Sequence, residues 1–121
     1  MALLDDLIAR MRAAPELSDI QVAENEAVDD ETFVFKIQAS IIPNFLQIRF
    51  LADGNFRRYS FQLYSDRPLL RWDNTPHYPT LENSPHHFHD QTGNVHPSPL
   101  TGKLLDDFEI VLQKIKVFMG I

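Results

Sequence analysis

The sequence predicts an α+β fold in which one antiparallel β-sheet packs against N-terminal and C-terminal helices. A segment near each end of the chain repeats apolar residues at helical spacing, whereas the chain between them alternates apolar and polar side chains. Short turns separate the alternating segments, and short turns make neighbouring strands antiparallel. We therefore expect a β-meander of about five strands within residues 18–73, in a single domain covering residues 1–121.

The first helix is expected over residues 2–14. Its apolar residues recur at intervals of three and four, and they are Leu3, Leu4, Leu7, Ile8 and Met11. Asp5 near the start and Arg10 near the end suit the helix dipole, and Pro15 ends the segment.

The strands are marked by a period of two. Phe33, Phe35 and Ile37 alternate with polar residues, as expected for a half-buried strand. Asp53-Gly54 predicts a tight hairpin because glycine readily adopts a positive φ. The strand expected after this turn has an apolar face consisting of Tyr59, Phe61 and Leu63.

The second helix is expected over residues 101–119, with Thr101 as its N-cap. Its apolar residues share one face, and they are Leu104, Leu105, Phe108, Val111, Leu112, Ile115, Phe118 and Met119.

Residues 73–100 show no clear periodicity and are expected to form a functional loop, with a short extra strand near Val95. This loop contains all five histidines of the chain, which are His77, His86, His87, His89 and His96. The only tryptophan, Trp72, immediately precedes it. Histidine titrates near neutral pH and is the commonest metal ligand, so we expect the chemistry of the protein here.

The composition excludes several classes of protein. A formal net charge of −6 argues against wholesale attraction to nucleic acid, although Arg57, Arg58, Arg67 and Arg71 allow a local basic face. The absence of cysteine excludes disulfides, thiolate metal sites and cysteine nucleophiles. No apolar run has the length of a membrane span and no signal peptide is recognisable, so we expect a cytoplasmic protein with no membrane partner.

One hypothesis for the histidines is a metal site. In an extended segment, His87 and His89 share one face while His86 points to the other. Two ligands then come from this triplet, and His77 or Asp73 supplies a third. The protein would be a hydrolase that depends on a divalent metal such as zinc, bound by His77, His87 and His89; the alternative is that it needs no cofactor.

A second hypothesis is ribonuclease chemistry without a metal. One histidine removes the proton of the ribose 2′-hydroxyl, another protonates the leaving oxygen, and an arginine stabilises the phosphorane. The expected catalytic residues are Arg71, Asp73, His77, His87 and His89, with Asp73 orienting a histidine. The expected substrate-binding residues are Arg58, Tyr59, Trp72, Asn74 and His86.

Two interpretations without catalysis stay open. The histidines can simply hydrogen-bond to carbonyl groups and hold the loop in shape. Alternatively, the loop is a protein-binding module in which Trp72, Tyr78 and Phe88 are the anchors.

Two segments of this region resemble a known family. They read Leu70-Arg-Trp-Asp-Asn-Thr-Pro-His77 and Ser84-Pro-His-His-Phe-His89, and they follow a strand with Tyr59-Ser-Phe-Gln-Leu63. In this order, and before an amphipathic helix, they resemble the TumE-type toxins, small prokaryotic proteins usually encoded beside an antitoxin. The chain departs from the family pattern at Tyr78, in place of a second histidine, and at Ser84, in place of phenylalanine.

The resemblance implies the toxin component of a toxin–antitoxin pair. Its partner would be a cognate antitoxin protein, and its target RNA or the translation machinery. The resemblance carries over only the motif positions, which are Arg71, Trp72, Asp73, Asn74, Pro76, His77, Pro85, His86, His87 and His89.

Overall fold

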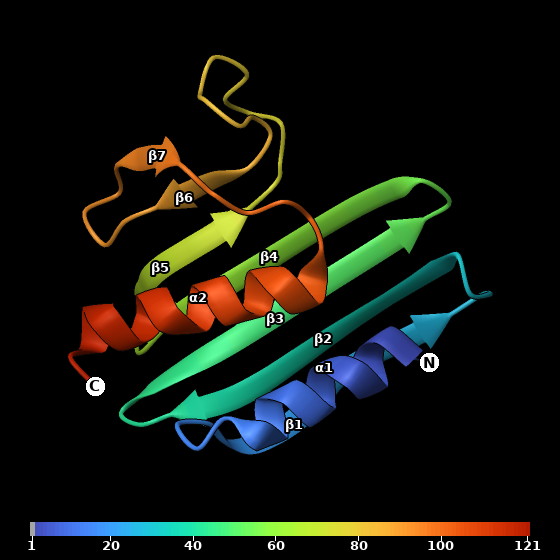
Figure 1. Cartoon of the computed structure of the whole chain (residues 1–121), viewed down its shortest axis with the longest axis horizontal. Helices are drawn as coiled ribbons and strands as arrows, with labels where there is room; N and C mark the ends of the chain where they lie inside the picture. Colours follow the sequence, from blue (N-terminus) through green and yellow to red (C-terminus); the bar gives the residue numbers. More distant parts are fainter. Residues whose placement is uncertain (1) are drawn as a thin grey trace.

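The structure, a computed structural model that describes residues 2–121, consists of a seven-stranded antiparallel sheet with two helices on one of its faces (Figure 1). The helices are α1 (Ala2–Ala13) and α2 (Leu104–Met119). The strands are β1 (Ser18–Ala27), β2 (Thr32–Ile41), β3 (Asn44–Asp53), β4 (Phe56–Tyr64), β5 (Pro68–Asp73), β6 (His87–His89) and β7 (Val95–Pro97). They lie side by side in chain order, so the predicted α+β meander is confirmed, with seven strands instead of about five.

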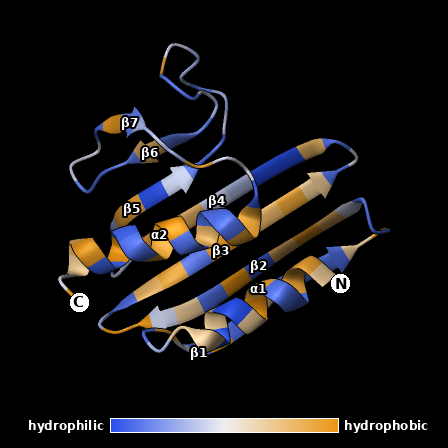
Figure 2. Ribbon diagram, in the orientation of Figure 1, coloured by the Kyte–Doolittle hydropathy of each residue, from blue (hydrophilic) through white to orange (hydrophobic). Residues whose placement is uncertain are grey.

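The long strands are amphipathic, and this divides the sheet into two unlike faces. Every second residue of β2, from Phe33 to Ile41, is buried, and β3 and β4 follow the same pattern. Directly paired residues of adjacent strands lie on the same face, so the apolar positions gather beneath the helices. Hydrophobic and hydrophilic bands alternate along both helices as well (Figure 2), and their buried residues complete one core.

The other face of the sheet carries the intervening polar side chains and no helix, and we refer to it as the open face. Of the helices in residues 2–121, neither has the length and apolarity needed to cross a membrane.

The expected loop over 73–100 contains two strands. The extra strand expected near Val95 is β7, whereas β6 was not expected. β6 pairs with β5 and places Phe88 on Trp72, with ring centroids 4.9 Å apart in the core. It escaped prediction because three residues are too few to establish a period of two along the sequence.

The start of α2 also differs from the expectation. Thr101 is not the N-cap: the helix begins at Leu104, and the N-cap residue Lys103 makes no side-chain capping bond. Instead the buried carboxylate of Asp107 reaches back and accepts hydrogen bonds from the backbone N–H groups of Thr101 (3.0 Å) and Gly102 (2.8 Å). An acid in the first turn thus satisfies the donors that precede the helix.

Candidate functional site

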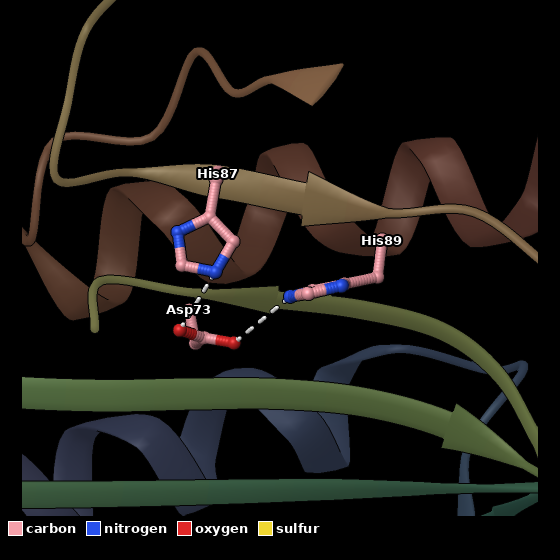
Figure 3. A group of neighbouring side chains, drawn as sticks. All are labelled: Asp73, His87 and His89. Carbon is pink, nitrogen blue, oxygen red and sulfur yellow. Dashed lines mark ion pairs between the residues drawn. The ribbon is translucent and has the colours of Figure 1, made fainter. Parts of the chain in front are cut away.

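Four predicted site residues meet on the open face, where β5 and β6 run side by side. Strand pairing sets Asp73 opposite His87 and Arg71 opposite His89. Residues two apart in a strand share a face, so all four side chains lie together while Trp72 and Phe88 face the helices. Figure 3 shows both imidazole rings directed at the Asp73 carboxylate. We refer to Arg71, Asp73, His87 and His89 as the Asp73 cluster.

Asp73 is the centre of this cluster and is only 4% exposed. Its Oδ1 accepts a hydrogen bond from the Thr75 backbone N–H (2.9 Å) and lies 3.1 Å from Nε2 of His87. Its Oδ2 accepts a hydrogen bond from Nε of Arg71 (2.9 Å) and lies 3.6 Å from Nε2 of His89. Burial alone would raise the pKa of the Asp73 carboxyl, but these hydrogen bonds and the charges of His87 and Arg71 outweigh it and lower the pKa.

His87 is buried between two hydrogen-bond acceptors. Its Nδ1 lies 3.0 Å from the Pro85 carbonyl oxygen, and its Nε2 faces Asp73. A carbonyl oxygen only accepts, so Nδ1 must carry a hydrogen, and a carboxylate at Nε2 calls for a second one. The contact through Nδ1 therefore leaves Nε2 of His87 directed at the Asp73 carboxylate.

His89 and Arg71 are the members of the cluster that solvent reaches, with side chains 29% and 40% exposed. Burial lowers the pKa of His89, and the charges of His87 and Arg71 add to this, while Asp73 opposes it. His89 is therefore neutral at neutral pH. Its Nε2–H faces the carboxylate, which leaves Nδ1 as the basic nitrogen.

Tyr78, from the segment between β5 and β6, covers the two imidazoles. Its ring meets His87 edge-on with centroids 4.8 Å apart, and it meets His89 with centroids 6.1 Å apart. This cover explains why His87 is 2% exposed although it lies on the open face. Tyr78 was expected as an anchor of a binding module. In the structure its ring packs on His87 and His89 of the cluster.

The other predicted histidines lie elsewhere. His77 is exposed and touches the cluster only through Tyr78, whose ring centroid is 6.3 Å from its own. His86 is on the helix side, as the alternation of side chains predicts, and its Nδ1 is 2.8 Å from the Tyr59 hydroxyl. Burial lowers the pKa of His86, although the charge of Asp107 opposes this.

The remaining predicted substrate-binding residues have structural partners. Trp72 is 1% exposed and belongs to the core, as does Tyr59, whose pKa is raised by burial and by the nearby carboxylates of Asp107 and Asp73. Asn74 continues the β5–β4 pairing with its side chain: Oδ1 accepts from the Tyr59 N–H (3.0 Å) and Nδ2 donates to the Arg57 carbonyl (2.9 Å). Arg58 lies on the open face with its guanidinium over the Phe56 ring.

Asp73, His87 and His89 can also bind a metal ion, since their ligand atoms lie within 4.8 Å of one another. Two histidines and one carboxylate form a common ligand set for divalent metals. The Pro85 carbonyl holds Nδ1–H of His87, as is typical of metal-bound histidine. Of the two predicted third ligands, Asp73 belongs to this group and His77 does not.

Sequence reasoning missed two partners of the cluster. Gln62 accepts a hydrogen bond from Arg71 (3.3 Å), and Pro85 contributes its carbonyl oxygen to His87. The predicted pairing of neighbouring strands could have suggested Gln62, which lies on the face of its strand away from Phe61. The contact between His87 and the Pro85 carbonyl could not be predicted, because every residue has a main-chain oxygen.

Comparison of the sequence with known protein families identifies the family of the chain. The family model described as Toxin TumE matches residues 4–118, nearly the whole chain. No curated protein and no solved structure matches it.

Proposed function

The chain belongs to the TumE toxin family, and from that premise we propose that it is the toxin of a toxin–antitoxin pair and cleaves RNA with the Asp73 cluster as its catalytic centre. One observation carries the proposal. A partly exposed, neutral histidine stands beside an exposed arginine, and a buried, ionised carboxylate contacts both.

In the proposed reaction His89 is the general base. Its Nδ1 takes the proton of a ribose 2′-hydroxyl, and the 2′ oxygen attacks the adjacent phosphorus. The bond from phosphorus to the 5′ oxygen breaks and leaves a 2′,3′-cyclic phosphate. Asp73 faces Nε2 of His89 and stabilises the imidazolium that forms, as the carboxylate of a catalytic triad does.

Arg71 and His87 have supporting roles in this proposal. The Arg71 guanidinium is fixed through Nε by Asp73, and its exposed end stabilises the charge that develops on the phosphorane. His87 is too buried to touch substrate, and it acts as a positioning residue that holds Asp73 ionised.

His77 is our candidate for the general acid that protonates the leaving 5′ oxygen. It is exposed, and the Tyr78 ring contacts both His77 and His89, with centroid distances of 6.3 and 6.1 Å. Substrate bound against Tyr78 would then lie near both histidines.

The ribonuclease proposal is tested with purified protein and a short end-labelled RNA. We expect products ending in 2′,3′-cyclic phosphate, no cleavage where a 2′-deoxy nucleotide replaces the ribose, and a loss of cleavage in His89→Ala. A folded His89→Ala protein that cleaves at the parental rate would refute the assignment of the base. Intact RNA after growth arrest would refute the ribonuclease.

The antitoxin is tested by co-expression with the neighbouring open reading frame. We expect induction of the chain alone to arrest growth and co-expression to restore it, with the two proteins purifying together. Arrest that the neighbour does not relieve would contradict this pairing.

A metal-dependent hydrolase is the second candidate, and the contact between His87 and the Pro85 carbonyl favours it. That contact frees Nε2 of His87 to bind a cation together with Asp73 and His89. The metal would supply an activated water and polarise the phosphate, and Arg71 would still bind the substrate.

Zinc titration separates the two candidates. If the cluster is a metal centre, zinc binds the chelator-treated protein with release of protons, and Asp73→Ala abolishes binding while His96→Ala does not. Calorimetry in two buffers of different ionisation enthalpy measures both quantities. RNA cleavage that is unaffected by a chelator, without zinc binding at the cluster, would eliminate this candidate.

A further inference from the structure

We propose that the open face of β2–β5 binds single-stranded RNA, with unpaired bases stacked on Phe45 and Tyr64 and the backbone leading to the Asp73 cluster. The inference rests on the proposed ribonuclease activity and adds the form of its substrate and the surface that holds it.

The first support is charge. On the open face of β2–β5, strand register places four cations and two carboxylates; the cations are Lys36, Arg49, Arg58 and Arg71, and the carboxylates are Asp53 and Asp73. The other seven Lys and Arg of the chain accompany the other fifteen Asp and Glu. Strands β2–β5 thus present two more positive than negative charges on an acidic protein. Two of the cations have acidic partners: Arg49 lies 3.8 Å from Glu24 of the bordering strand β1, and Arg71 is hydrogen-bonded to Asp73. Local positive charge of this kind attracts phosphate in spite of the net charge.

The second support is a row of amide side chains that leads to the cluster. Direct pairing across five strands sets Gln21 beside Gln38, Gln38 beside Gln47, Gln47 beside Gln62, and Gln62 beside Arg71. Two hydrogen bonds join members of the row, from Gln38 to Gln47 (3.1 Å) and from Arg71 to Gln62 (3.3 Å). Amides both donate and accept, so they can meet the edges of any unpaired base.

The third support is an aromatic pair beside this row. Phe45 and Tyr64 are paired across β3 and β4 on the open face, with ring centroids 5.6 Å apart, and Phe45 is 43% exposed. A hollow opens on each side of the pair: one is lined by Gln47 and Gln62, the other by Gln21 and Gln38. Stacking on such rings is the usual way in which proteins hold single-stranded bases.

The aromatic pair and the cluster are continuous. Tyr64 lies two residues from Gln62 along β4, which is roughly 7 Å at the rise of a strand. Gln62 is paired with Arg71, and Arg71 with His89. Because two strand spacings of about 4.8 Å separate Gln62 from His89, a nucleotide stacked at Tyr64 would lie roughly 12 Å from the proposed general base. In a duplex the bases stack on one another and expose no face to Tyr64, so the surface selects single strands.

Binding is measured by fluorescence anisotropy with a fluorescein-labelled, mixed-sequence single-stranded RNA, in a His89→Ala background so that cleavage does not interfere. We expect Phe45→Ala with Tyr64→Ala to weaken binding about ten-fold or more. Lys36→Ala and Arg49→Ala should each reduce the slope of log affinity against log salt by about 0.7. The matched controls, Phe118→Ala and Lys103→Ala, change an exposed aromatic and a cation away from the open face and should leave binding unchanged.

Three outcomes would overturn the inference. One is equal affinity for duplex and single-stranded RNA, and another is equal loss in the control variants. The third is an open face that binds no RNA in the free protein and becomes protected from hydrogen exchange by the co-expressed neighbour, which would make it a protein interface. If the parent protein cleaves RNA but the variants show none of these binding effects, the proposed RNA-binding surface is refuted and the proposed ribonuclease activity stands. If the variants show the binding effects but the parent protein cleaves no RNA, the RNA-binding surface stands and the ribonuclease activity is refuted.

Discussion

The histidine-rich region contains two groups in which histidine meets aspartate, and their contrast is instructive. His96 approaches Asp90 to 2.7 Å, closer than either histidine approaches Asp73. Yet the His96 and Asp90 side chains are 49% and 26% exposed, whereas that of Asp73 is 5% exposed. The shorter contact is therefore the one that water screens.

The two carboxylates also differ in what else they bind. Asp90 accepts hydrogen bonds from the hydroxyl and backbone N–H of Thr92 and from the Asn94 N–H, so it closes its own turn. Hydrogen bonds from Thr92 and His96 lower the pKa of Asp90. Asp73 joins an arginine and two histidines from two strands. A short distance between histidine and aspartate therefore marks a turn in one case and the proposed catalytic centre in the other, and burial distinguishes them.

The sharpest test of this contrast is Asp73→Asn against Asp90→Asn. Asp73→Asn leaves buried His87 without its carboxylate, so we expect a loss of about 3 kcal/mol in the free energy of unfolding. RNA cleavage should fall by about 10³-fold or more, since Asp73 contacts the proposed general base, His89, and the Arg71 guanidinium. Asp90→Asn should keep its cleavage rate and change stability far less. Denaturant unfolding and single-turnover cleavage measure both, and equal losses in the two variants would break the comparison.

His89→Ala against His96→Ala separates the same groups by activity alone. Loss of a general base costs about 10²- to 10⁴-fold in rate, and His89 is exposed enough for its removal to leave the fold intact. His96→Ala should cleave RNA like the parent. The comparison fails if both variants arrest growth and cleave RNA equally well.

Asn74→Ala tests a residue that neighbours the cluster and was expected to bind substrate. Its side chain makes two hydrogen bonds to the backbone of β4, so we expect a loss of about 2 kcal/mol in unfolding free energy. The Michaelis constant should stay near that of the parent. A large rise in that constant with unchanged stability would instead identify Asn74 as a substrate contact.

The pH dependence of cleavage gives a smaller effect. His89 must be neutral to act as a base, and its pKa lies below 6.5. The midpoint of the acidic limb should therefore lie below pH 6.5, at the pKa of His89. An acidic limb centred above pH 6.5 would contradict the assignment.

The pH dependence of stability gives the smallest effect. The pKa of Asp73 is lowered from 3.8 in the folded protein, so its stabilising contribution is complete above that value and is lost as the pH falls through the folded pKa. The difference in unfolding free energy between the parent and Asp73→Asn should be constant near neutrality and shrink below pH 3.8. A difference that is unchanged in acid would show that charge does not cause it.

Much of the sheet was predictable because burial on one face imposes a period of two. The alternation at Phe33, Phe35 and Ile37 and the turn at Gly54 correctly predicted β2 and the hairpin that follows β3. β6 was not predictable in this way, since its three residues are too few to show a period. The predicted start of α2 was wrong because Asp107, inside the helix, accepts hydrogen bonds from residues five and six positions earlier. Capping rules consider shorter separations along the chain.

The location of the candidate site in the sequence was predictable, but the arrangement of its side chains was less so. The density of histidines drew attention to residues 73–100, and alternation correctly separated His86 from His87 and His89. The pairing of β6 with β5 then decides which histidines meet Asp73, and this pairing depends on the path of the intervening segment. His77 was predicted to join the other histidines as a catalytic residue or metal ligand, but the structure does not place it in the group that could bind a metal.

The chain-order arrangement of the strands has a consequence for biosynthesis. Each strand pairs with the one made just before it, so β1 to β4 can assemble while the rest of the chain is still being translated. The Asp73 cluster needs β6, because His87 and His89 belong to it. A nascent polypeptide truncated before β6 lacks His87 and the proposed general base, His89, so under the ribonuclease proposal such a fragment would not cleave RNA.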